Sequence, residues 1–315
     1  MTLVLNRVLR HEVILAVLLI AALIVLAGQS EHFWTADNIL NQGRLMAEVG
    51  LIALPMTFVI VTGGIDLSVG SIFGLSAILL GVFWQNMGLP LPVAMLGAVL
   101  VGAVAGLGNG FIITRFKVPP LIATLATLAL YRGLAEGISQ ARSVRGYPEW
   151  FLGLGTEDLL GVPNQLWLMI LCFVIAAFIL GMTTFGRTTY AIGSNEVAAR
   201  FSGLKVDRAK LLIYGASGLI AGLAAVIFVS RVSTTRSDMG TGLELDVITA
   251  VVLGGTSIFG GRGTIIGTGL GLILMQALKN GLALSGVKGD GTIVVIGAVL
   301  IAAILIGNLL SRDGD

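Results

Sequence analysis

The chain has 315 residues, of which 56% are hydrophobic and only 11% are charged, and its mean hydropathy is +0.98. Ordinary soluble domains carry roughly 25% charged residues, so this composition predicts an integral membrane protein. The formal net charge of +2 is too small to indicate a nucleic-acid partner, and a single cysteine, Cys172, excludes a disulfide within the chain.

About ten apolar stretches follow one another along the chain, and they predict an all-α, polytopic bundle of transmembrane helices. The stretches are 13–28, 45–62, 69–84, 91–113, 118–139, 165–184, 211–230, 245–258, 264–278 and 292–310. Several are shorter than the roughly 20 residues that a straight span needs, so short or broken helices are expected among them. We expect residues 1–315 to form one transmembrane domain, and the first stretch to be an uncleaved helix.

The distribution of lysine and arginine predicts that both termini are cytoplasmic. Five basic residues cluster in 187–210, and cytoplasmic loops are the ones enriched in positive charge. This orientation makes 185–210 a cytoplasmic loop and 139–164 an external loop. The external loop has mixed charge and several aromatic residues, which suits either contact with a soluble partner or a plain solvated connector.

One polar, glycine-broken stretch lies between two apolar runs, at residues 62–70. It contains Gly63 and Gly64, followed by Asp66. A carboxylate beside hydrocarbon-compatible segments is costly unless it faces a cavity, water or a partner, and it therefore indicates a functional site. Backbone freed by the glycine pair is tolerated at that depth only inside protein or beside a water-filled cavity. The pattern is typical of a translocation pathway.

Three roles are open for Asp66. It could line a pathway for a polyol-like solute, with Thr62, Ser68 and Asn109 as hydrogen-bonding neighbours. It could be the proton-coupling carboxylate of a secondary transporter. It could also cap a helix that begins near Leu67, as an N-cap aspartate does. A capping residue can still line a pathway, so these roles are not exclusive.

The cytoplasmic loop contains a short predicted helix, Asn195–Phe201. Ser194 or Asn195 can cap it, and Glu196 is favourably placed at its positive N-terminal end. A short amphipathic helix of this kind suits docking into a groove on another protein. The alternative is a basic connector that lies near anionic lipid.

Glycines spaced four residues apart predict close helix packing, at Gly102, Gly106 and Gly110 and again at Gly218 and Gly222. Arg132 and Glu136 are also four apart, which predicts an ion pair within one helix.

Motifs for catalysis and for nucleotide binding are missing from the sequence. No G-x-x-x-x-G-K-[ST] element occurs, so any ATP-binding site must lie on another chain. We expect no catalytic residue, no metal site and no cofactor.

Three stretches resemble the permease family of bacterial ABC importers for ribose, xylose, rhamnose and autoinducer-2. They are VTGGIDLSVGS, FGRTTYAIGSNEVAARFSGLKV and ELDVITAVVLGGTSIFGGRGTIIG. The run MAEVGLIALPMTFVIVTGGIDLSVGS together with ARSVRGYPEW is most similar to rhamnose-type permeases, and autoinducer-2-type permeases come next.

The resemblance implies a type II importer-like fold in the bacterial inner membrane. It also implies a second permease chain, two cytoplasmic ATPase subunits and a periplasmic solute-binding protein. The expected cargo is a small neutral sugar, a pentose or a deoxyhexose such as rhamnose, with autoinducer-2 import or proton-coupled sugar transport through Asp66 as alternatives.

The resemblance also assigns residues. The family's pathway motif falls on Gly63, Gly64, Asp66, Ser68 and Gly70. Its coupling helix falls on Gly193–Gly203, and the residues expected to contact the ATPase are Gly193, Asn195, Glu196, Ala199, Arg200 and Gly203.

Overall fold

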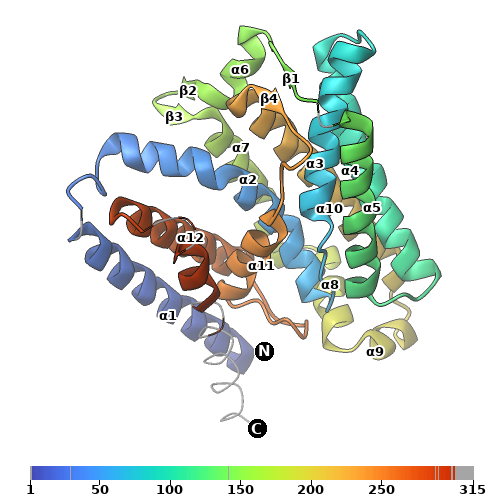
Figure 1. Cartoon of the computed structure of the whole chain (residues 1–315). Helices are drawn as coiled ribbons and strands as arrows, with labels where there is room; N and C mark the ends of the chain where they lie inside the picture. The colour runs from blue at the N-terminus through green and yellow to red at the C-terminus, as the bar shows by residue number, and fades with distance from the viewer. Residues whose placement is uncertain are drawn as a thin grey trace.

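The computed structural model describes residues 2–28, 30–140, 142–287, 289, 291–298 and 301. Most of these residues are helical (Figure 1), which confirms the predicted all-α class. The helices are α1 (Thr2–Ala27), α2 (Ala36–Val61), α3 (Val69–Gly81), the π-helix η1 (Val82–Asn86), α4 (Leu91–Arg115), α5 (Pro120–Ser139), α6 (Glu149–Thr156), α7 (Asn164–Met182), α8 (Thr184–Ser194), α9 (Glu196–Phe201), α10 (Val206–Val232), α11 (Leu243–Leu253) and α12 (Ile265–Leu284).

Seven helical segments in the described part of the chain are long and apolar enough to cross a membrane: α2, α3 with η1, α4, α5, α7, α10 and α12. The count of about ten is therefore not confirmed. The apolar stretch found in α1 is Leu15–Ala27, which is shorter than the seven candidate spans. Helix α11 has 11 residues, or about 16 Å at 1.5 Å per residue, roughly half the hydrocarbon thickness. Most of the predicted segment 292–310 lies outside the described residues.

The central helix of the bundle is α2. Thr35 caps its N-terminus by accepting the backbone N–H of Asn38, and the helix ends at Val61. Residues Ala47 to Val61 are buried without interruption, because α7, α10, α11 and α12 all pack against it. The helix stops there because Gly63 adopts φ +77°, a left-handed conformation that glycine tolerates and most residues do not.

The most extensive helix–helix contact joins α4 to α10, and it depends on the predicted glycines. A Cβ atom added to Gly106 would collide with the carbonyl of Tyr214 and lie 2.9 Å from the nitrogen of Gly218. A Cβ on Gly102 would likewise meet the backbone of Gly218 and Gly222. The two backbones therefore touch directly, as small residues permit in membrane helices.

The two predicted loops lie at opposite ends of the bundle (Figure 1). The loop 139–164, predicted to be external, holds α6 and three short strands. Strand β1 (Val144–Arg145) pairs with β4 (Thr234–Thr235), and β2 (Asp158–Leu159) pairs with β3 (Val162–Pro163), both antiparallel. The loop 185–210 is mostly helical, since it comprises most of α8, all of α9 and the first turn of α10.

Replacing Gly106 with alanine should weaken the α4–α10 contact. The new methyl group would push against backbone of α10, and overpacking of this kind costs about 1–3 kcal/mol. We expect Gly106→Ala to lower the melting temperature of the detergent-solubilised protein by several degrees. Gly108→Ala is the matched control in the same helix, because its Cβ would have only Tyr131 Oη nearby, at 3.5 Å. Equal melting temperatures for the two variants would contradict the packing argument.

Candidate functional site

Asp66 lies in the connection between α2 and α3 and is completely buried. One of its carboxyl oxygens accepts the backbone N–H of Ser68 at 3.0 Å and the Ser68 hydroxyl at 2.6 Å. The other oxygen accepts the hydroxyl of Ser217, from α10, at 3.1 Å. The carboxyl group thus joins the helix break to α10.

Helix α4 completes this polar cluster. Asn109 donates from Nδ2 to the Ser68 hydroxyl at 2.7 Å and is itself fully buried. Tyr131 of α5 donates its hydroxyl to the carbonyl of Ala105 at 3.0 Å, with Asn109 Oδ1 3.4 Å away. Four elements therefore supply the hydrogen bonds that a buried polar break requires.

The capping prediction needs a correction. Helix α3 begins at Val69, and its N-cap position is Ser68 rather than Asp66. The Asp66 carboxyl still accepts the N–H of the cap residue, two positions along the chain, which is the local pattern that aspartate uses to organise turns. Asp66 therefore stabilises the start of α3 from outside the helix.

Thr62, Gly63 and Gly64 lie in the same connection and Gly70 lies just beyond it in α3, and the four residues have different surroundings. Thr62 is buried and donates its hydroxyl to the carbonyl of Val59 at 2.7 Å. Gly63 is exposed, whereas Gly64 faces the hydroxyl of Tyr214, 2.5 Å from where its Cβ would be. Gly70 lies further along, within α3, where a Cβ would collide with the backbone of Gly240.

In this conformation the cluster is closed. Asp66, Ser68 and Asn109 are all 0% exposed, so they present no polar atom to a passing solute. A cavity of about 360 Å³ lies elsewhere, between α2, α7 and α12, and its lining is apolar. A role for the cluster in the pathway stays a prediction.

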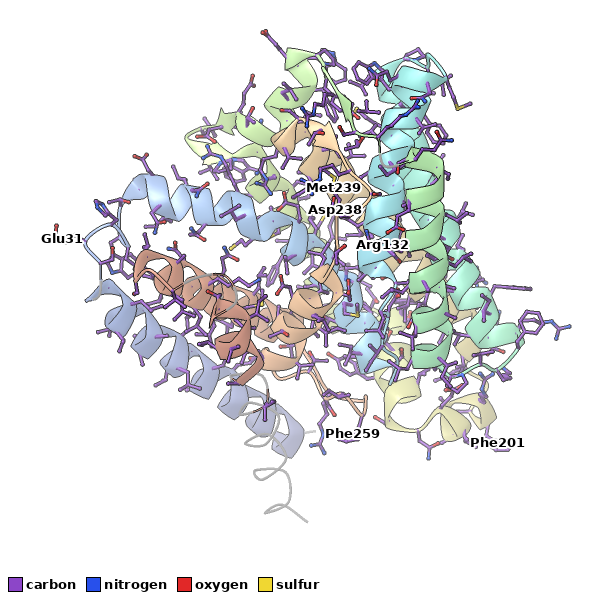
Figure 2. All side chains as sticks on the ribbon, viewed as in Figure 1. Glu31, Arg132, Phe201, Asp238, Met239 and Phe259 are labelled. Atoms are coloured by element: carbon purple, nitrogen blue, oxygen red, sulfur yellow. The ribbon has the colours of Figure 1, made fainter. Side chains whose placement is uncertain are left out.

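Arg132 does not form the predicted ion pair with Glu136. Its guanidinium reaches across α3 and donates to the carbonyls of Ser237 at 2.7 Å and Met239 at 2.8 Å (Figure 2). The prediction was wrong because the two backbone carbonyls, far away in sequence, are better placed than the exposed carboxylate one turn along α5. Arg132 thereby holds the segment that leads from β4 to α11.

The structure contains a buried ion pair that was not predicted from the sequence. Glu48, in the middle of α2, accepts from Arg231 Nε of α10 at 2.9 Å and is 3% exposed. The Arg231 guanidinium also lies over the ring of Phe228, 5.1 Å from its centroid. A charged residue within an apolar helix was the available signal, although its partner is far away in sequence.

The segment between α8 and α10 forms a compact helical corner at the lower end of the bundle (Figure 1). Asn195 is the N-cap of α9 and accepts the backbone N–H of Ala198 at 2.9 Å, as predicted for one of two candidate caps. Ala199 is buried at 5% exposure and packs with Ile192. Gly203 ends the corner with φ +80°, the left-handed C-terminal geometry that glycine favours.

An ion-pair network fastens α9 to α10. Arg200 donates to Glu196 at 2.7 Å and to Asp207 at 2.6 Å. Glu196 also accepts from Lys210, and Lys117 of the α4–α5 connection bonds Asp207 at 3.1 Å. The two charged residues that are predicted to contact the ATPase, Glu196 and Arg200, are therefore already paired within this network.

The network is strongest at neutral pH. Burial acts to raise the pKa of Glu196, but hydrogen bonds from Lys210 and Arg200 outweigh it and lower that pKa below its ordinary value. A lowered pKa means that the stabilisation is fully present above the ordinary carboxyl pKa. It is lost as the pH falls through the lowered value.

Glycines join this corner to the end of α2. A Cβ on Gly193 would collide with the carbonyl of Val61, and that carbonyl accepts the N–H of Gly261 at 2.9 Å. A Cβ on Gly260 would lie 2.9 Å from the nitrogen of Gly63. Three segments far apart in sequence thus meet backbone to backbone. Only Gly193 and Gly63 belong to the predicted sets.

Comparisons with known proteins place these features in context. The sequence profile of a family described as "Branched-chain amino acid transport system / permease component" matches residues 36–304. The ribose import permease protein RbsC of Bacillus subtilis is 44% identical over 285 residues, which is 90% of this chain and 88% of the relative. The autoinducer 2 import system permease protein LsrD of Escherichia coli K12 is 37% identical over 300 residues, with 93% and 91% covered.

Removing the Asp66 carboxyl should destabilise the protein. Asp66→Ala deletes three hydrogen bonds and leaves buried hydroxyls unpaired, at a cost of about 1–3 kcal/mol per unsatisfied group. Asp66→Asn keeps an oxygen for Ser68 and offers an amide to Ser217, so we expect it to melt close to wild type while Asp66→Ala melts several degrees lower. Asp238→Ala removes an exposed carboxylate that pairs with Arg236 and serves as control. The role of the cluster is refuted if Asp66→Ala melts no lower than this control.

Proposed function

Because the chain belongs to the permease-component family of branched-chain amino acid transport systems, we propose that it is the membrane-spanning subunit of an ABC importer for a small neutral sugar or a related signalling molecule. It is a transport component and not an enzyme. The observation that supports this most strongly is the similarity to import permeases along nine-tenths of the chain. The packed helical corner at α9 supports it independently.

The names of the two relatives suggest two candidate substrates. One is named for ribose and the other for autoinducer 2, so we propose a ribose-like pentose first and autoinducer 2 as the second candidate. The rhamnose-type assignment is not confirmed by these relatives.

The proposed assembly contains a second permease chain, two cytoplasmic ATPase subunits and an external solute-binding protein in the bacterial inner membrane. Both termini of the permease would be cytoplasmic. The basic cluster in 187–210 supports placing α9 inside. The external loop would then offer α6 and its short strands to the binding protein, and the exposed Trp150 and Leu160 suit such a contact.

We propose that movement of the ATPases reaches the pathway through backbone contacts. Force on α9 passes through Gly193 to the carbonyl of Val61, which is the last residue of α2. From there it reaches the α2–α3 connection and Asp66. Such coupling requires that the nucleotide-loaded ATPases bind the two conformations with different affinity.

The rival from another class is a proton-coupled secondary transporter that uses Asp66. Its carboxyl group satisfies three hydrogen bonds within the subunit, which suits a structural role. The importer predicts that sugar uptake by Asp66→Asn persists and depends on ATP. The rival predicts that the same substitution stops uptake and that an uncoupler does so in the wild type.

Reversing the charge of Arg200 should release the ATPase. Arg200→Glu would place a third carboxylate beside Glu196 and Asp207, so α9 would leave its position against α10. We expect at least tenfold less ATPase to co-purify with the tagged permease, while membrane insertion stays normal. Arg145→Glu is the matched control, because it makes the same charge change at the opposite end of the bundle, where Arg145 is exposed and forms no ion pair with any described residue. Equal ATPase retention in both variants would contradict the assignment of α9 to the ATPase interface.

The transport proposal itself is tested in proteoliposomes that contain the permease with its ATPase and binding protein. Uptake of radiolabelled ribose should require ATP and the binding protein, and should survive an uncoupler. Autoinducer 2 and rhamnose are tested under the same conditions. Uptake that requires only a proton gradient would instead show that the chain is a proton-coupled secondary transporter.

A further inference from the structure

Two aromatic side chains protrude from the end of the bundle that carries α9. Phe201, the last residue of α9, is 89% exposed, and Phe259, in the connection from α11 to α12, is 84% exposed. Figure 2 shows both pointing away from the body of the molecule at the same end. Two such aromatic side chains at the same end of a membrane protein are candidates for contact with a protein partner or with the membrane interface.

Helix α9 divides into an inner and an outer face. Ala199 packs inward, and Glu196 and Arg200 are engaged in the ion-pair network. Besides the small, exposed Ala198, the residues left to face outward are Val197, 62% exposed, and Phe201. They are four positions apart and so lie on one side of the helix.

Phe259 is held by a rigid turn. The N–H of Gly260 bonds the carbonyl of Ser257 at 2.9 Å, and the N–H of Ser257 bonds the carbonyl of Arg262 at 3.0 Å. Gly260 and Gly261 have φ of +85° and +74°, which fixes the direction of the chain after the aromatic residue.

The turn and α9 are parts of one unit. A Cβ on Gly260 would lie 3.0 Å from the carbonyl of Gly193, and one on Gly261 would lie 2.9 Å from Ser194 Oγ. Gly193 and Ser194 are the last residues of α8 and lead directly into α9. Phe259 therefore cannot move far without moving the start of the α9 corner.

The charges around this surface indicate the character of its partner. Arg187, Lys205, Arg208 and Arg262 are exposed, and none forms an ion pair with a described residue. The carboxylates of α9 and α10, Glu196 and Asp207, are in contrast already paired within the network, and Glu12 accepts the hydroxyl of Thr264. A partner that covers the two aromatic residues would gain most from an apolar groove with an acidic rim.

We propose that the Ser257–Gly260 turn is a second docking element for the ATPase, with Phe259 inserting into an apolar, acidic-rimmed groove beside the one that receives Val197 and Phe201. This inference rests on the proposed importer function and adds a contact outside the coupling corner. A single six-residue helix would let the partner pivot, whereas two linked contacts fix its orientation and let it exert torque on the end of α2.

The test uses site-directed photo-cross-linking on the assembled complex. Cys172 is the chain's single cysteine, so Cys172→Ala gives a cysteine-free background, checked for ATPase retention. Phe259→Cys, Phe201→Cys and Leu160→Cys are then made in it one at a time and labelled with benzophenone maleimide. Leu160 is the matched control, since it is 87% exposed but belongs to the β2–β3 hairpin at the opposite end. We expect ATPase adducts from positions 201 and 259 and none from 160.

A binding measurement accompanies the cross-linking. Phe259→Ala should weaken retention of the ATPase about tenfold, as buried aromatic anchors do, with an unchanged melting temperature because the side chain is exposed. An adduct from position 201 but not from 259, with normal retention by Phe259→Ala, would overturn this inference and leave the importer function intact. Adducts at 259 that contain lipid only would overturn it as well. Failure of the unmodified chain to retain any ATPase would instead reject the proposed function.

Discussion

A buried break between two helices leaves polar groups that must find hydrogen bonds inside the protein, and the rest of the structure depends on how this is met between α2 and α3. The Asp66 carboxyl group accepts the backbone N–H of Ser68, and Asn109 of α4 donates to the Ser68 hydroxyl. Ser217 reaches the same carboxyl group from α10. Glycines let α4 and α10 approach until their backbones touch, and Asn109 of α4 and Ser217 of α10 both bond to this cluster.

The same break lies directly beside the α8–α9 corner. The carbonyl of Val61 bonds Gly261 and lies against Gly193, so α2, the α8–α9 corner and the turn before α12 share one joint. The proposed coupling uses this joint, since close-packed backbone is stiff and would transmit a displacement of α9 to α2. The ion pairs of Glu196 and Arg200 then serve to hold α9 against α10, and its apolar outer face remains for a partner.

The structural features that depend on a few neighbouring residues were predicted well. The short helix after Asn195 follows from a capping residue and a favourable first-turn glutamate, and α9 begins where these place it. The glycines of α4 and α10 follow from their spacing of four. The pairing of Arg132 was missed, because its partners are carbonyls about a hundred residues away. The fold of the external loop was missed as well, because β1 finds its partner strand only at Thr234–Thr235.

Hydropathy, glycine spacing and helix caps act over a few residues, so the sequence alone predicts the membrane class, the helical content, the broken segment around Asp66 and the short helix after Asn195. The folded structure was needed to show that Asp66 is buried, that Glu48 has a partner, and that the turn carrying Phe259 packs against the end of α8. Each of these depends on segments that are distant in the chain and are brought together by packing, and no local pattern specifies which distant residue will be the neighbour.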